Sequence, residues 1–368
     1  MKLTRLRLFD FRNYETLDLM LDPGVNLILG ENAQGKTNLL EAVGYLSTGR
    51  SFRTQKTQEL IRFGAEFADL NADVFSQGRD QTIRAVLFSG RRPRQLYLGG
   101  VKQKSAADLP GVLTTVLFCP EDLLVLKGGS QPRRRLLDNA LCQLRPSYAS
   151  ALAEYNRLLD SKSRILKDYR EKPDLLEPLP EYNYRLAQVG AMVISHRARY
   201  LKALEQAASG YHKAFSAGRE TMTLVYRTVS TVEDPFAERK TIFEQILEHQ
   251  ERHYRAELDS GQCLTGPHKD DFDALLDEIP VKAFGSQGQT RTAAISLKLS
   301  ERELLRRDTG EEPVLLLDDV LSELDATRQD FVLNQITSGQ VLITCCEPGR
   351  VTKIGKTIEI RAGGLVCT

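Results

Sequence analysis

The chain has 368 residues, of which 41% are hydrophobic and 27% are charged, and its formal net charge is +1. This length exceeds that of a typical single domain, so we expect two compact parts. No apolar run approaches the roughly 20 residues needed to cross a bilayer, and the N-terminus lacks the apolar core of a signal peptide. The six scattered cysteines include no Cys-x-x-Cys pair, which argues against a disulfide framework and a zinc ribbon. We therefore expect a cytoplasmic protein with no membrane partner.

The first thirty residues predict a hairpin followed by a buried strand. Leucines alternate with polar residues over residues 5–8 and 17–21, as in strands with one buried face. Val25–Leu29 is a nearly continuous apolar run, which is typical of a strand covered on both faces. Residues 36–46 then have the pattern of a helix. A short glycine-containing loop must join this buried strand to the helix.

That loop, residues 30–37, reads Gly-Glu-Asn-Ala-Gln-Gly-Lys-Thr, and we call it the phosphate loop. Gly30 and Gly35 let backbone N–H groups turn towards a triphosphate at a helix N-terminus. Lys36 can reach the β- and γ-phosphates, and Thr37 offers a hydroxyl to Mg²⁺. The loop predicts ATP and Mg²⁺ as cofactors, with Lys36 in a catalytic role and Thr37 as a metal ligand. The residues expected at the nucleotide are Gly30, Glu31, Asn32, Ala33, Gln34, Gly35, Lys36, Thr37 and Asn38.

Residues 67–100 alternate again and predict an antiparallel sheet beside the nucleotide core. Between Arg79 and Lys104 there are seven Lys or Arg residues and one acid, Asp80. Such clustering is the footprint of a surface that tracks phosphates, although a solvated basic face is the alternative. The DNA-contacting residues predicted here are Arg91, Arg92, Arg94, Lys102 and Lys104.

A long, mainly helical insertion follows. Residues 131–166 and 181–218 carry apolar residues at three and four spacing, a proline-rich break separates them, and residues 235–258 supply a further helix. From Gln131 to Arg170 nine bases face four acids, so this lobe is a second candidate for DNA contact. We predict a helical lobe over 129–260, inserted into an ATPase head formed by 1–128 and 261–368.

Two motifs mark the return to the head. Residues 265–271 read Thr-Gly-Pro-His-Lys-Asp-Asp and predict either a structural turn or a contact with nucleotide or a partner subunit. Residues 286–289, which we call the signature loop, place Ser286, Gln287, Gly288 and Gln289 at a helix start, where N–H groups and a hydroxyl can meet a phosphate. Because the phosphate loop already covers one face of ATP, we expect the signature loop to serve the nucleotide of a second subunit. A plain N-cap at Ser286 is the alternative.

The last motif is an acidic pair at the end of an apolar strand. Leu315–Leu317 precede Asp318 and Asp319, at the end of the strand where α/β sheets place ligands. Asp318 suits the shell of Mg²⁺, and Asp319 is predicted as the catalytic base or water-orienting group. Two aspartates that begin a surface loop are the alternative.

Together these residues resemble the RecF family of recombination mediators, which is related to the SMC and Rad-fifty ATPases. The resemblance covers nearly the whole chain, through segments 11–14, 30–37, 48–53, 120–123, 127–129, 133–134, 266–269, 286–289 and 318–325. It implies an ATP-dependent homodimer, with Asp325 near the nucleotide, that binds double-stranded and gapped DNA. It further implies RecR, with RecO, as partners in loading a recombinase onto single strands.

Two departures from the wider ABC pattern predict slow hydrolysis. The signature loop is Ser-Gln-Gly-Gln rather than Ser-Gly-Gly-Gln, and Ile343–Cys346 has no histidine where transporters carry a switch residue. Gln55 and Gln58 are both candidates for the glutamine loop. Arg50 and Arg53 approach phosphate or DNA, or are ordinary surface residues.

We therefore predict an α/β fold, an ABC-type ATPase head made of a P-loop core sheet and an antiparallel β subdomain, with the helical lobe inserted. The predicted activity is a weak DNA-dependent ATPase that switches a DNA clamp used in repair. A kinase that transfers phosphate to a small substrate is the alternative from another class. The ATPase subunit of a transporter or a nuclease complex is a third.

Overall fold

The computed structural model describes residues 1–366 except 55, 105–108, 110, 337 and 347–354. It divides into two compact units, Met1–Leu124 with Arg291–Thr368, and Val125–Thr290. The second unit ends at Thr290 rather than at the predicted residue 260. The reason is that the strand that begins at Asp271 pairs with a strand over Met222–Arg227, which belongs to the same unit. Both ends of the chain contribute to the first unit, and the second unit is one continuous segment between them.

The first unit is built on a six-stranded, mainly parallel sheet in the order β15-β14-β3-β13-β12-β8. Its strands are β3 (Val25–Leu29), β8 (Thr115–Phe118), β12 (Val314–Asp318), β13 (Val341–Cys345), β14 (Lys356–Arg361) and β15 (Gly364–Leu365). All five residues of β12 are buried, as in a parallel sheet covered on both faces. The strand predicted at residues 25–29 is confirmed, and β13 and β14 flank it.

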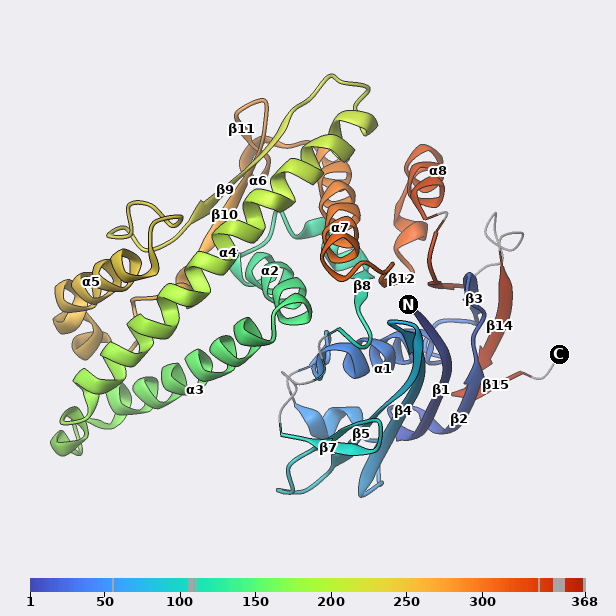
Figure 1. Ribbon diagram of the computed structural model, residues 1–368, viewed down its shortest axis with the longest axis horizontal. Helices are drawn as coiled ribbons and strands as arrows, with labels where there is room; N and C mark the ends of the chain where they lie inside the picture. Colours follow the sequence, from blue (N-terminus) through green and yellow to red (C-terminus); the bar gives the residue numbers. More distant parts are fainter. Residues whose placement is uncertain (55, 105–108, 110, 337, 347–354, 367–368) are drawn as a thin grey trace. The chain divides into compact units, whose positions relative to one another are not determined.

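A second, antiparallel sheet in this unit has the order β2-β1-β4-β5-β6-β7 (Figure 1). Its strands are β1 (Lys2–Phe11), β2 (Tyr14–Met20), β4 (Phe67–Ser76), β5 (Arg79–Phe88), β6 (Gln95–Leu98) and β7 (Val101–Gln103). The buried side chains Leu6, Leu70 and Ile83 share one core with α1 (Lys36–Thr48). The predicted N-terminal hairpin, the helix after the phosphate loop and the antiparallel sheet are therefore confirmed.

Helices connect the core strands of the first unit. Helix α7 (Gln287–Thr309) begins in the second unit and continues into the first, and α8 (Ala326–Gln335) follows β12. Short 3₁₀ turns complete the unit: η1 (Thr57–Leu60), η3 (Pro120–Leu124) and η6 (Val320–Glu323).

The second unit is mainly helical. Its long helices are α2 (Ser130–Leu144), α3 (Pro146–Asp168), α4 (Leu179–Phe215) and α5 (Arg239–Ser260). The helical stretch predicted at 131–166 consists of α2 and α3, and Pro146 begins α3 in the first turn, where a missing N–H is tolerated. The unit also contains a three-stranded sheet that the sequence analysis missed, β11-β10-β9. It consists of β9 (Met222–Arg227), β10 (Asp271–Leu276) and β11 (Ile279–Pro280), with η4 (Pro173–Leu176), η5 (Pro267–Lys269) and α6 (Val281–Phe284) beside the longer elements.

The Thr265–Asp271 motif forms a turn whose side chains bond inside the second unit. Tyr155 Oη lies 2.8 Å from His268 Nδ1, and His268 Nε2 lies 3.1 Å from the carbonyl oxygen of Cys263. Burial lowers the pKa of His268 to about 4, so this ring is neutral near pH 7. Arg197 bonds the carbonyl oxygen of Pro267 at 2.7 Å. These contacts favour the structural alternative for the motif.

No helix in the described part of the chain is long and apolar enough to cross a membrane.

Candidate nucleotide site

The phosphate loop has the backbone that its glycines predict. Gly35 has φ +113°, and a Cβ built there would lie 2.6 Å from the Asn13 side-chain nitrogen. A side chain at Gly30 would meet the carbonyl oxygen of Ile360 at 2.4 Å. A larger residue at Gly35 would displace the Asn13 side chain or the loop, and one at Gly30 would displace β14 or the loop. The loop therefore needs both glycines to follow its path from β3 to the start of α1.

The Lys36 side chain folds back over the phosphate loop and bonds carbonyl oxygens of the loop. Its Nζ donates to the carbonyl oxygens of Gly30 at 2.5 Å and Glu31 at 2.9 Å. The Sγ of Cys346, which follows β13, lies 3.3 Å from the same nitrogen. The side chain is only 7% exposed, so its position is well defined by its surroundings. The ammonium group thus lies within the loop, where it can meet an anionic ligand.

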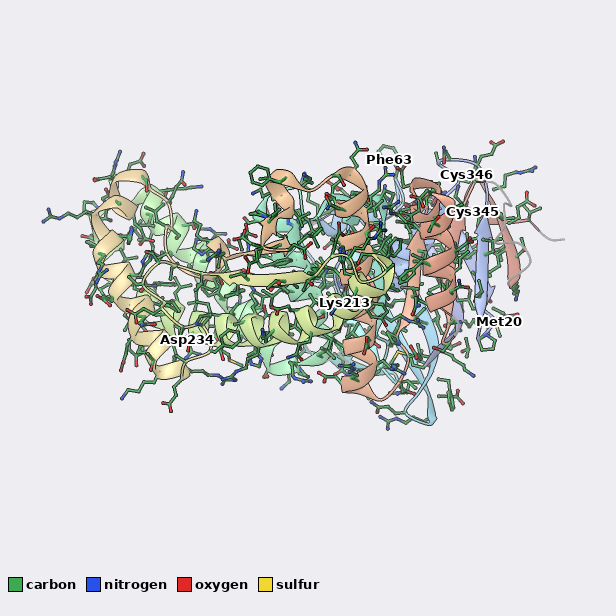
Figure 2. All side chains as sticks on the ribbon, turned by 90° about the horizontal axis from the view of Figure 1, so that it is seen from above. Met20, Phe63, Lys213, Asp234, Cys345 and Cys346 are labelled. Carbon is green, nitrogen blue, oxygen red and sulfur yellow. The ribbon has the colours of Figure 1, made fainter. Side chains whose placement is uncertain are left out.

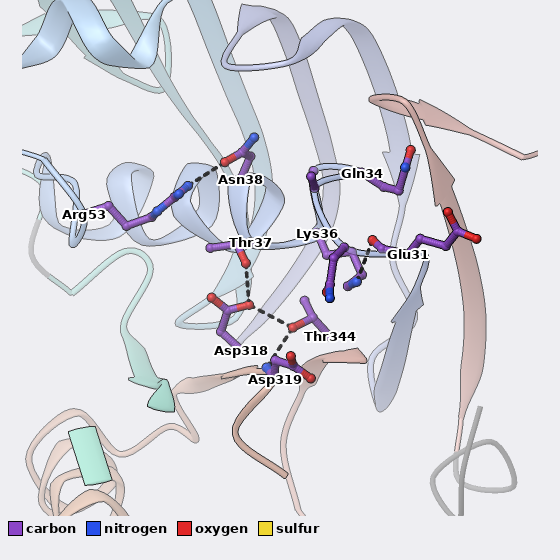
Figure 3. A pocket seen from close by; sticks show the side chains of 12 residues that line it. Glu31, Gln34, Lys36, Thr37, Asn38, Arg53, Asp318, Asp319 and Thr344 are labelled. Carbon is purple, nitrogen blue, oxygen red and sulfur yellow. Dashed lines mark hydrogen bonds between the residues drawn. The ribbon is translucent and has the colours of Figure 1, made fainter. Parts of the chain in front are cut away.

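Thr37, at the start of α1, forms a hydrogen-bonded group with Asp318 and Thr344, which lie at the carboxyl ends of the neighbouring strands β12 and β13 (Figure 3). The hydroxyls of Thr37 and Thr344 donate to Asp318 Oδ1 at 2.9 and 2.8 Å. The Thr344 hydroxyl also accepts a hydrogen bond from the backbone N–H of Asp319 at 2.9 Å. Parallel pairing sets Asp318 opposite Thr344. The predicted metal ligands Thr37 and Asp318 are therefore neighbours in space.

The chemistry of this group fits Mg²⁺. Burial raises the pKa of Asp318, while the hydrogen bonds from Thr344 and Thr37 lower it. Mg²⁺ prefers oxygen ligands, and it is usually held by one or two carboxylates together with phosphates and water. The described residues contain no cluster of three or more His, Cys, Asp or Glu side chains that could hold a metal ion. If a nucleotide occupies the site, Thr37 and Asp318 would be the side chains that hold its Mg²⁺.

A cavity of about 360 Å³ brings together most of the residues predicted at the nucleotide in the first unit, although Asp325 is not among its lining residues. The cavity is lined by the phosphate-loop residues Glu31 to Thr37, by Asn38 after the loop, and by Arg53, Asp318, Asp319 and Thr344. Gly30 lies at the base of the loop, where it accepts a hydrogen bond from Lys36. The donors and acceptors of this cavity are a lysine ammonium, hydroxyls, a helix N-terminus and carboxylates, the set that a magnesium triphosphate requires.

Side chains outside the predicted set support the loop from behind. Asn13 donates to the carbonyl oxygen of Gln34 at 2.9 Å and accepts from Asn38 at 2.8 Å. The Tyr14 hydroxyl donates to the carbonyl oxygen of Gly35 at 2.9 Å. Gln34 Oε1 accepts from the backbone N–H of Ala362, in the β14–β15 turn, at 2.5 Å. Asn13 and Tyr14 belong to a motif on which the family resemblance rests, so the sequence carried a signal for them.

An adjoining hollow of about 740 Å³ shares Asn38 and Arg53 with the cavity. Arg53 donates to Asn38 Oδ1 at 2.7 Å and lies 3.5 Å from Glu41, so it is a residue of the site rather than an isolated surface side chain. Gln58 and Phe63 line the hollow, and Phe63 is fully exposed (Figure 2). Gln55, the other candidate for the glutamine loop, lies outside the described residues.

The signature loop belongs to the second unit and makes a reciprocal helix cap. The backbone N–H of Gln289 donates to Ser286 Oγ at 3.2 Å, and the N–H of Ser286 donates to Gln289 Oε1 at 2.9 Å. This pair of bonds is a capping box. The N-cap alternative therefore describes the geometry of Ser286, and a phosphate-binding role for Ser286, Gln287, Gly288 and Gln289 stays a prediction.

Asp325 and the basic segment also have defined surroundings. The Asp325 side chain caps α8 by accepting from the N–H of Arg328 at 2.9 Å. Arg94 donates to the Tyr45 hydroxyl at 2.9 Å and to the carbonyl oxygen of Gly49, so its guanidinium group is already used in the first unit. Arg92 stacks over Phe88, with 4.3 Å between the guanidinium carbon and the ring centroid. All five predicted DNA contacts are exposed, namely Arg91, Arg92, Arg94, Lys102 and Lys104.

A P-loop between a buried parallel strand and a helix faces an acidic pair at the end of β12, with β13 between the two strands, and this arrangement defines the nucleotide-binding head of an ABC-type ATPase. The family model described as "RecF/RecN/SMC N terminal domain" matches residues 2–364. A curated relative from Agathobacter rectalis, named DNA replication and repair protein RecF, is 38% identical over 340 residues, or 92% of this chain and 91% of the relative. The chain therefore belongs to the RecF family.

Solved structures agree with this assignment. One described as the recombination mediator protein RecF-ATPrS in the RecFOR pathway has a TM-score of 0.90 and 33% identity, and the match covers 99% of this chain and 97% of that one. The Smc head domain derived from Pyrococcus furiosus has a TM-score of 0.55 at 15% identity, covering 99% and 94%. The second match supports the fold alone. The predicted ABC-type head and the predicted family are both confirmed.

Proposed function

We propose that the protein is an ATP-dependent DNA clamp that acts in recombinational repair and replication-gap processing in the cytoplasm. The observation that carries this proposal is the cavity in which Lys36 and Thr37 meet Asp318 and Asp319. Bound ATP with Mg²⁺ would supply a triphosphate whose γ-phosphate is present in one state and absent in the other. Relatives named for DNA replication and repair, and a neighbour described in a RecF-ATP state, support the same reading.

The residues of the cavity divide the work between binding and hydrolysis. Lys36 and the loop N–H groups would bind the phosphates, while Thr37 and Asp318 would hold Mg²⁺. Asp319 lines the same cavity as the predicted metal ligands Thr37 and Asp318, where it would orient the attacking water. Thr344 stands at the end of β13, and its hydroxyl is already engaged by Asp318 and the Asp319 N–H. With no histidine there, hydrolysis would be slow and would serve to release the clamp.

ATP would join two copies of the chain. The signature loop lies at the N-terminus of α7, a 23-residue helix whose start carries partial positive charge. The Ser286 hydroxyl oxygen accepts a hydrogen bond from the Gln289 N–H. The hydroxyl hydrogen can therefore be donated to a phosphate of the ATP that the second subunit binds. If the signature loop of each subunit contacts the ATP bound by the other, two copies of the chain form a homodimer only when ATP is present. Asp325 would lie in the same interface.

The clamp would hold double-stranded and gapped DNA through exposed basic side chains. Arg91, Lys102 and Lys104 are exposed on the β5–β6 and β6–β7 part of the antiparallel sheet. Arg92 adds to them, and Arg94 acts mainly by holding the segment in place. Because a neighbour is described as part of the RecFOR pathway, RecR with RecO are the proposed partners in loading a recombinase.

The test is binding to a gapped duplex, followed by fluorescence anisotropy, with and without ATP and Mg²⁺. Tight binding that needs both ATP and Lys36 is expected, so Lys36→Ala should behave like the wild type without nucleotide. Binding that is indifferent to ATP and to Lys36→Ala would refute the clamp. Asp319→Asn should still dimerise with ATP but turn over slowly, and fast turnover by this variant would remove Asp319 from the catalytic role.

A further inference from the structure

The side-chain amide of Gln289 is fixed on both sides. Its Oε1 accepts from the N–H of Ser286 at 2.9 Å, and its Nε2 donates to Glu220 Oε1 at 2.8 Å. A flipped amide would set its NH₂ against the Ser286 N–H and its oxygen against a carboxylate, so the network allows one orientation only. Gln289 is therefore tied both to its own loop and to a residue 69 positions away.

Glu220 has a second partner that holds its other oxygen. His212 Nε2 lies 2.9 Å from Glu220 Oε2, and the His212 ring is completely buried in the last turn of α4. A carboxylate only accepts hydrogen bonds, so Nε2 carries the proton that it donates. The amide of Gln289 and the ring of His212 both lower the pKa of Glu220, which stays ionised at neutral pH. Each carboxylate oxygen thus has its own donor.

Glu220 lies on the connection from α4 to β9, and this connection is itself anchored. The next residue, Thr221, exchanges hydrogen bonds with Asp277 of the β10–β11 turn: its N–H donates to Asp277 Oδ1 at 2.9 Å, and its carbonyl oxygen accepts from the Asp277 N–H at 3.0 Å. The N–H of Glu220 donates to Ser216 Oγ at 3.3 Å. The carboxylate therefore projects from a well-supported connection towards the signature loop.

We propose that Glu220, held by His212, is a positioning residue that orients Gln289 and with it the signature loop. This inference rests on the proposed function, in which that loop contacts the ATP of a second subunit. With Glu220 in place, Gln289 completes the capping box and Ser286 is held as its acceptor. Without Glu220, the amide loses its outer partner and the loop becomes free to open.

A purely structural role would make a different prediction from a positioning role. Glu220 belongs to the second unit, whereas the cavity that binds the phosphates belongs to the first. Loss of a positioning residue should therefore weaken ATP-dependent dimerisation and leave ATP binding by a single subunit unchanged. General unfolding would reduce both.

The experiment compares wild type, Glu220→Ala, Glu220→Gln and Glu278→Ala as full-length chains. Glu278 is an exposed acid on the nearby β10–β11 turn and serves as the matched control. Sedimentation with Mg²⁺ and a slowly hydrolysed ATP analogue gives the dimer Kd, and a fluorescent ATP analogue at low protein concentration gives the affinity of single subunits. Glu220→Ala should raise the dimer Kd about tenfold, as expected for a hydrogen bond to a charged group, with ATP affinity unchanged. Glu220→Gln keeps one acceptor oxygen and should recover most of the loss.

Hydrogen exchange in the ATP-free monomer tests the positioning without relying on dimerisation. The backbone N–H of Gln289 should exchange its hydrogen about tenfold faster in Glu220→Ala than in wild type, because the signature loop opens more often. Equal exchange and an equal dimer Kd in Glu220→Ala and Glu278→Ala would overturn the inference. If wild type does not dimerise with ATP while exchange still responds to Glu220, the proposed function fails and the positioning role stands.

Discussion

Thr344 gives the sharpest test of how the acidic pair is held. Its hydroxyl donates to Asp318 Oδ1 and accepts from the N–H of Asp319, and the side chain is only 1% exposed. Thr344→Val keeps the shape and removes both bonds. A hydrogen bond to a charged group contributes about 1.5–3 kcal/mol, and an unpaired buried N–H costs about 1–3 kcal/mol. Allowing for partial relaxation, the free energy of unfolding should fall by about 2–4 kcal/mol at neutral pH.

The loss should depend on pH in a defined direction. Burial already raises the pKa of Asp318 above its ordinary 3.8, and the Thr344 hydroxyl opposes that rise by stabilising the carboxylate. Without the hydroxyl the folded-state pKa rises further while the unfolded value stays the same. A raised folded pKa means that stability falls as pH increases above the unfolded value. The difference between Thr344→Val and wild type should therefore be smallest in acid, where Asp318 is protonated, and reach its full size above the folded pKa.

Urea unfolding of the wild type, Thr344→Val and Thr344→Ser at several pH values measures this difference. The serine variant keeps the hydroxyl and loses only a methyl group, so it controls for packing. Equal stability of the valine and serine variants at neutral pH, or a difference that grows on acidification, would refute the reasoning.

Three further predictions concern the phosphate loop and the basic segment. Gly35→Ala should weaken ATP binding about tenfold in a nucleotide titration, because φ +113° is strained for alanine; unchanged affinity would show that the loop adapts. Alkylation of Cys346 with N-ethylmaleimide should block ATP binding, because its Sγ lies 3.3 Å from Lys36 Nζ. The Cys346→Ser variant should keep its ATP binding after the same treatment. Normal ATP binding by the alkylated wild type would contradict this prediction. Arg94→Ala should lower the unfolding free energy by about 1–2 kcal/mol, whereas Arg91→Ala should leave it unchanged and reduce the salt slope of DNA binding by about one; the opposite pattern in paired melts and anisotropy titrations would reverse the roles.

The geometry of the candidate nucleotide site could be predicted largely because its strongest signal is local. Residues 25–48 hold the buried strand, the phosphate loop and the helix in one continuous segment, and the structure has the same order. Asp318 and Asp319 were found by the same logic, at the end of an apolar run. Thr344 was not, because its role depends on the parallel register that pairs it with Asp318. That register exists only once the order of the strands is known.

The second unit was harder to predict from its sequence because some of its pairings join distant segments. Its helices carry strong apolar periodicity and were found, but β9 and β10 are short, half-exposed strands separated by the whole of α5. The bond between Glu220 and Gln289 is equally non-local: the signature motif singled out Gln289, but nothing in the sequence marks Glu220 as its partner. Arg94 was grouped with its basic neighbours because charge alone does not reveal that its guanidinium group bonds Tyr45 and Gly49.

The strand order of the core sheet also constrains how the protein can fold during synthesis. β3 pairs with β13 on one side and β14 on the other, and both partners are made some three hundred residues after it. An emerging chain therefore carries an apolar strand with two unpaired edges while the whole helical unit is translated, and unpaired edges invite aggregation. The second unit, whose contacts lie within one continuous segment, can form first. Ribosome-bound chains should thus gain a folded helical unit before they gain any capacity to bind a nucleotide.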